Sequence, residues 1–143
     1  MSTKQINIFI SHAWKYSEHY DTLADWIFNE NWSVGQASLD FRNYSVPKDN
    51  PIHDATNDKQ LKEAILNQIA MSHVIVIPTG VYATYSKWIQ KEIDGSTYYR
   101  KPILAINPWG QQRTSCVVIS AASKLVGWNK QSVVEGIWEL YQR

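Results

Sequence analysis

Residues 5–12 have the sequence QINIFISH, and the first six of them set the fold class. Ile6, Ile8 and Ile10 alternate with Asn7 and Phe9, so residues 5–10 form a nearly continuous apolar run. Runs of this length, bounded by polar residues, are typical of parallel strands that are buried on both faces. We therefore expect residues 5–10 to be a central strand, with helices on both sides of its sheet.

Strand and helix patterns alternate along the rest of the chain. Further strands are predicted at 36–41, 73–77, 102–106 and 125–128, the last at a sheet edge, and residues 111–123 are ambiguous. Amphipathic helices are predicted at 16–30, from Lys59 with Asp58 as N-cap, from 85 to about 100, and at 131–142. The alternation predicts one α/β domain over residues 1–143, a flavodoxin-like sandwich around a five-stranded parallel sheet in the order 2-1-3-4-5.

In that order, ligands bind above the carboxyl ends of the strands, near the first and third. Residues 11–14 and 78–80 follow those two strands. Residues 42–58 follow the second strand; they show no helical or strand period and exceed an ordinary connection in length. We expect these segments to surround a functional site.

The predicted helix after the third strand contains the sequence YSKWIQKEI at residues 85–93. Trp88 and Glu92 are four residues apart, which places an indole and a carboxylate one turn from each other on one helix face. Ile89 and Ile93 repeat the spacing beside them. Two interpretations follow: Glu92 is a solvated bystander at the rim of an apolar face, or it is the acid of a site.

Composition excludes several functions. A net charge of +1 without a basic stripe argues against nucleic acid. No apolar run approaches the ~20 residues of a membrane span, and no signal peptide is evident. Cys116 is the single cysteine, lies in an apolar context typical of inert packing, and leaves the cytoplasm as the expected compartment. Seven Trp and eight Tyr are many for 143 residues; they are either core or a stacking surface.

Motifs of common enzyme classes are absent. The chain has no dinucleotide-binding or P-loop glycine pattern and no G-x-S-x-G elbow. Its four His show no metal-ligand spacing, so no metal site is expected. The third strand ends in Ile77-Pro78-Thr79, without the acid that a phosphorelay receiver needs.

The sequence IFISH at 8–12, combined with Trp88-Ile89-x-x-Glu92-Ile93, resembles TIR and TIR-like domains over nearly the whole chain. The pattern is most similar to the small TIR-like proteins of the Thoeris anti-phage systems (ThsB type). This resemblance implies cleavage of the nicotinamide–ribose bond of NAD+ as substrate, with no further cofactor. It implies a cyclic or conjugated ADP-ribose signal that activates a separate effector protein, a phage-derived trigger and assembly as a homo-oligomer.

The resemblance also assigns roles to residues. Glu92 takes the place of the catalytic glutamate, and Trp88 that of a pocket wall. The other expected substrate-binding residues lie at the first two strand ends or in the loop after them: Ser11, His12, Trp14, Asp40, Phe41, Tyr44 and Ser45. Simpler roles remain open: loop capping for His12 and Asp40, and packing for Trp88, Phe41 and Trp109.

One acid is sufficient for this chemistry. Glycosidases use two carboxylates because one must protonate the leaving oxygen. Nicotinamide carries a positive charge in NAD+ and leaves as a neutral molecule, so a single carboxylate can stabilise the charge that develops on the ribose. Two rival functions remain: a non-catalytic TIR-like assembly module, and a nucleoside 2-deoxyribosyltransferase, which shares the sheet and the ribose–carboxylate chemistry.

Overall fold

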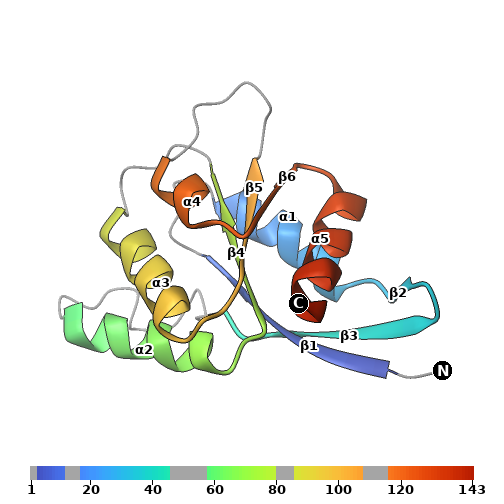
Figure 1. Cartoon of the computed structure of the whole chain (residues 1–143), viewed down its shortest axis with the longest axis horizontal. Coiled ribbons are helices and arrows are strands. Elements are labelled where there is room, and N and C mark those ends of the chain that lie inside the picture. The colour runs from blue at the N-terminus through green and yellow to red at the C-terminus, as the bar shows by residue number, and fades with distance from the viewer. Residues whose placement is uncertain (1–2, 12–16, 46–57, 80–85, 108–115) are drawn as a thin grey trace.

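A computed structural model describes residues 3–11, 17–45, 58–79, 86–107 and 116–143 (Figure 1). The strands are β1 (Thr3–Ile10), β2 (Trp32–Val34), β3 (Ala37–Asn43), β4 (Val74–Pro78), β5 (Ile103–Asn107) and β6 (Lys124–Gly127). The helices are α1 (Ser17–Phe28), α2 (Asp58–Ala70), α3 (Ser86–Tyr98), α4 (Cys116–Ala121) and α5 (Lys130–Gln142). The predicted α/β class is confirmed.

The sheet is mixed and contains six described strands in the order β2-β3-β1-β4-β5-β6. The pairs that join β3, β1, β4, β5 and β6 are parallel, whereas β2 is antiparallel to β3. The prediction of five strands, all parallel, was therefore wrong in strand count and order. A tight turn at Gly35, which has a φ of 60°, returns the chain so that Trp32–Val34, which lie between the predicted first helix and the predicted second strand, form an edge strand.

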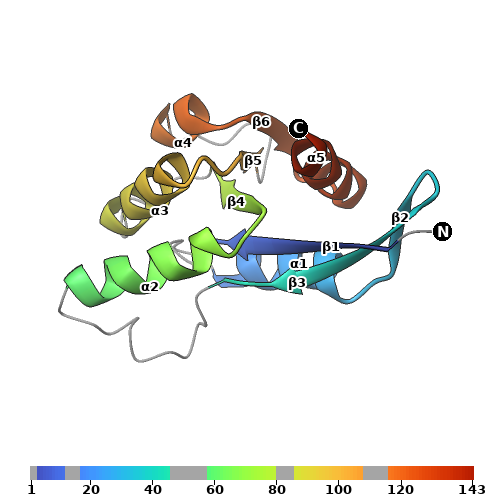
Figure 2. The ribbon, with the colours of Figure 1, turned by 60° about the horizontal axis from the view of Figure 1, so that its bottom comes forward.

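Helices cover both faces of the sheet, as Figures 1 and 2 show. Helices α1 and α5 contact each other on one face, and α2 packs against α3 on the other. Because side chains alternate along a strand, Ile6, Ile8 and Ile10 point to the α1 side, whereas Phe9 and Ser11 point to the α3 side. These five residues are all buried, as predicted for a central strand covered on both faces.

Several element boundaries differ from those predicted. Strand β3 continues to Asn43, so Asp40 and Phe41 do not end it. Helix α2 includes Asp58, which was predicted as its N-cap. The ambiguous segment contains the short helix α4, and β6 lies at the sheet edge as expected.

Asn129 caps the last helix. Its side chain accepts a hydrogen bond of 3.0 Å from the Ser132 backbone N–H, which satisfies one of the donors left free at the start of α5. We expect Asn129→Ala to lower the free energy of unfolding by about 1 kcal/mol in urea titrations, whereas Asn129→Asp keeps an accepting oxygen and most of the stability. An equal loss in both variants would contradict this capping role.

Candidate active site

Glu92 is the buried acid of this fold. Helix α3 turns Ile89, Glu92 and Ile93 toward the sheet, and Glu92 is 0% exposed. Glu92 Oε1 accepts a hydrogen bond of 3.1 Å from the Ser11 hydroxyl. The interpretation of Glu92 as a solvated bystander is therefore wrong, because its carboxylate is held beside the end of β1.

Burial changes the acidity of this group. Loss of solvation raises the pKa of Glu92 to about 8, and the Ser11 hydrogen bond opposes that rise. Glu92 Oε2 has no hydrogen-bond partner among the described residues, although it is fully buried. A buried carboxyl oxygen without a partner costs free energy unless a ligand uses it, which makes this atom a candidate for a ligand contact.

Ser11 lies where β1 ends, and the sheet fixes its backbone. Its N–H donates to the Val76 carbonyl oxygen at 3.0 Å, which continues the ladder between β1 and β4. Its hydroxyl can therefore reach α3 from a rigid element. The structure thus brings together two of the predicted site residues, Ser11 and Glu92.

Tyr44 and Ser45 lie beside this strand end. The Ser45 hydroxyl accepts a hydrogen bond of 2.8 Å from the Ile10 N–H, next to Ser11 in the chain. The Tyr44 N–H donates to the Ile8 carbonyl oxygen at 2.8 Å, and its own carbonyl oxygen accepts from Gln68 at 3.0 Å. Ser45 is buried and satisfies the backbone of β1, so its described contacts are structural.

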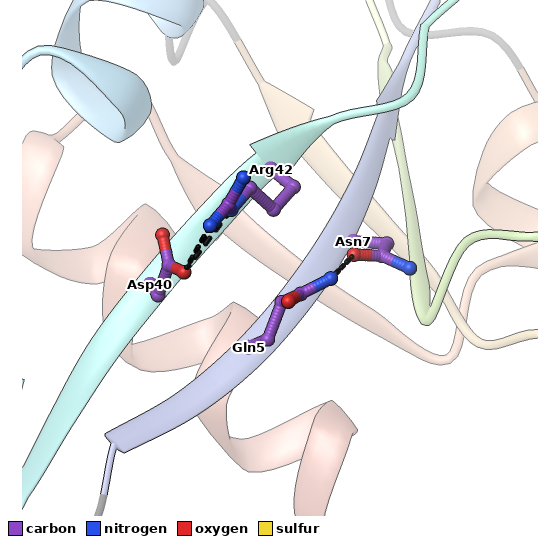
Figure 3. Close-up of polar contacts among 4 residues, drawn as sticks. All are labelled: Gln5, Asn7, Asp40 and Arg42. Atoms are coloured by element: carbon purple, nitrogen blue, oxygen red, sulfur yellow. Dashed lines mark hydrogen bonds and ion pairs between the residues drawn. The ribbon is translucent and has the colours of Figure 1, made fainter.

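Asp40 and Phe41 lie away from the pair. Asp40 is opposite Gln5 in the register, and Gln5 precedes Ser11 by six residues, about 20 Å along a strand. Figure 3 shows the Asp40 carboxylate bound by Arg42, at 2.9 Å, beside Gln5 and Asn7 of β1. Phe41 packs against the core. The expectation that these two residues end the second strand was wrong, because β3 continues to Asn43. Their substrate contacts stay a prediction.

The remaining predicted site residues are aromatic residues and a histidine, and the structure does not describe their side chains. His12, Trp14 and Trp109 lie outside the described residues. Trp88 belongs to α3, one turn before Glu92, but its side chain is also outside the described part. Four other tryptophans, Trp26, Trp32, Trp128 and Trp138, pack against the core.

Two further polar residues, which were not among the predicted site residues, also have unpartnered atoms. Thr79 Oγ1 and Asn107 Oδ1 are buried and have no hydrogen-bond partner among the described residues. Thr79 follows β4 and Asn107 ends β5. Each is the first polar residue after an apolar strand, and that signal could have identified them.

Other kinds of site find no support in the described part of the chain. Its His, Cys, Asp and Glu residues form no group of three that could hold a metal ion. None of its helices is long and apolar enough to cross a membrane.

The residues of this candidate site lie within a stretch that matches a known protein family. The family model described as "Thoeris protein ThsB, TIR-like domain" matches residues 9–113, which include Ser11, Thr79, Glu92 and Asn107. No curated protein matches the chain.

Proposed function

The chain belongs to the TIR-like domain family of the Thoeris protein ThsB, and on this basis we propose that it cleaves NAD+. Membership of this family implies an anti-phage defence role in a multi-component system. NAD+ cleavage is frequent among TIR-like domains. The observation that carries the proposal is the fully buried Glu92, with one oxygen bound to Ser11 and the other without a partner.

Glu92 stabilises the cation that forms as the bond breaks. The C–N bond between the ribose and nicotinamide breaks, its electron pair stays on the ring nitrogen, and neutral nicotinamide leaves. Positive charge then develops on the ribose C1′, where a carboxylate in a dry site is worth several kcal/mol. The free Glu92 Oε2 is the atom available for this contact.

Ionisation of Glu92 is coupled to substrate binding. Its pKa of about 8 means that most of the ligand-free protein carries a protonated Glu92 at neutral pH. The positively charged nicotinamide ring favours the ionised form when it enters the site. Ser11 keeps the carboxylate oriented because its hydroxyl donates to Oε1.

The fate of the ribosyl cation sets the product. Capture by water gives ADP-ribose, whereas capture by another nucleophile gives a cyclic or conjugated ADP-ribose. In the proposed pathway this nucleotide activates a separate effector protein. Burial of Glu92 supports the second outcome, because a site that excludes water favours capture by a bound nucleophile.

The test is direct. The protein is incubated with NAD+, alone and with lysate from phage-infected cells, and nicotinamide and nucleotide products are followed by liquid chromatography with mass spectrometry. We expect nicotinamide release that depends on the protein. Absence of release under both conditions would leave a non-catalytic assembly module, and turnover of deoxynucleosides with NAD+ untouched would indicate a deoxyribosyltransferase.

A further inference from the structure

Thr79 and Asn107 share one face of the sheet with Ser11. Phe9 pairs with Ile75, and Ile75 pairs with Ile103. Side chains two residues apart along a strand point to the same face of the sheet. Ser11 lies two residues after Phe9, and Thr79 and Asn107 lie four residues after Ile75 and Ile103, so all three polar residues share the face of these apolar ones. That face is the α3 side, because the Ser11 hydroxyl donates to Glu92.

All three residues also lie at carboxyl ends of adjacent strands. The Ser11 N–H donates to Val76 and the Thr79 N–H donates to Ile106, at 3.0 and 2.8 Å, so both continue their ladders. Pro78 pairs with Ile106, so Thr79 and Asn107 follow opposite each other on adjacent strands, about 4.8 Å apart. Ile10 pairs with Val76, so Ser11 lies opposite Ile77, and Thr79 lies two residues, about 7 Å, further along the strand direction than the Ser11–Glu92 pair. Together they form a polar row on the α3 side of the sheet.

The row has unused hydrogen-bonding capacity. Thr79 Oγ1 and Asn107 Oδ1 are buried without a partner among the described residues, as is Glu92 Oε2. Thr79 is 0% exposed. Buried polar groups are nearly always satisfied, so three unsatisfied atoms on the α3 side of the sheet point to a ligand that uses them.

The uncharged polar groups of Thr79 and Asn107 suit the nicotinamide end of NAD+ better than its phosphates. With the ribose at Glu92, the neighbouring groups of the substrate are the nicotinamide ring on one side and the phosphates on the other. Thr79 and Asn107 are uncharged, and a buried Asn107 Oδ1 would repel a phosphate oxygen. A carboxamide is complementary, because its carbonyl oxygen accepts from a hydroxyl and its amide N–H donates to an oxygen.

We propose that Thr79 and Asn107 bind the carboxamide of the departing nicotinamide, with the Thr79 hydroxyl donating to its oxygen and Asn107 Oδ1 accepting from its nitrogen. This proposal rests on the proposed NAD+ cleavage. It makes both residues specificity determinants for the pyridine group.

Two NAD+ analogues separate the two contacts. The acetylpyridine analogue keeps the carbonyl oxygen but lacks the amide N–H, and the thioamide analogue keeps the N–H but replaces the oxygen by sulfur, a weak acceptor. We expect Asn107→Leu to lower kcat/KM at least about tenfold for NAD+ and the thioamide analogue, with little change for the acetylpyridine analogue. We expect Thr79→Val to lower it for NAD+ and the acetylpyridine analogue, with little change for the thioamide.

Matched variants report on the fold. Thr97→Val and Asn67→Leu make the same chemical changes at exposed helix positions and should leave kcat/KM unchanged for all three substrates. Thr79→Ser keeps the hydroxyl and should restore the selectivity that Thr79→Val removes. Circular dichroism shows whether each variant is folded.

The outcomes are distinguishable. Equal losses on all three substrates, or no loss, would overturn the carboxamide contacts while leaving NAD+ cleavage intact. Absence of NAD+ turnover by the wild-type protein, alone and with infected lysate, would overturn both proposals together.

Discussion

Replacing Glu92 by Gln is expected to slow nicotinamide release from NAD+ by at least about 10²–10³-fold. The amide is nearly the same size and can still accept from the Ser11 hydroxyl, so the fold should persist. It cannot carry the negative charge that stabilises the ribosyl cation. The loss should therefore appear in kcat, with a smaller effect on KM, because the interaction is made mainly in the transition state.

Glu63→Gln is the matched control for this experiment. Glu63 is exposed on α2, and its substitution makes the same chemical change without altering the buried site. The wild type, Glu92→Gln and Glu63→Gln are compared by their initial rates at saturating NAD+. Wild-type rates in Glu92→Gln would show that another group stabilises the transition state.

The same substitution should change how stability depends on pH. Burial raises the pKa of Glu92 to about 8 in the folded protein, above its ordinary value of 4.5. Below the ordinary value both states hold the proton, and the contribution of Glu92 to stability is fully present. As pH rises toward the folded pKa, the unfolded state loses its proton first, so wild-type stability falls by up to about 1.4 kcal/mol per pH unit.

Gln does not titrate, so Glu92→Gln should become more stable relative to the wild type across this window. We expect the difference to grow to several kcal/mol near pH 8 and then level off. Urea titrations at pH values from 5 to 9 measure it, with Glu63→Gln as a variant whose curve should follow the wild type. Parallel curves for wild type and Glu92→Gln would show that the carboxyl group is not desolvated.

The sequence could predict the strands that have a continuous apolar pattern. Residues 5–10 and 103–106 lie in central strands, where hydrophobicity alone decides the structure. The hairpin at Gly35 could not be predicted in this way, because Trp32 and Val34 fit the end of an amphipathic helix as well as a strand. Pairing with β3 decides between them, and that pairing is a tertiary contact.

The candidate site was only partly predictable for the same reason. The four-residue spacing of Trp88 and Glu92 identified the helix face, and the end of the first strand identified Ser11. Spacing does not report burial, so it could not distinguish a solvated Glu92 from a desolvated one. It also gave no reason to place Ser11, Thr79 and Asn107 on one face of a sheet, because they follow or end different strands.

The amino-acid pattern thus determines by itself that this chain alternates strands and helices and carries an acid on the third long helix, because periodicity is a local property. Only the tertiary structure decides that Glu92 meets Ser11 across 81 positions of sequence, with one carboxyl oxygen left unpaired. The physical reason is that desolvation and hydrogen bonding depend on which elements pack together. The packing of α3 against the end of β1 decides the state of this carboxyl group.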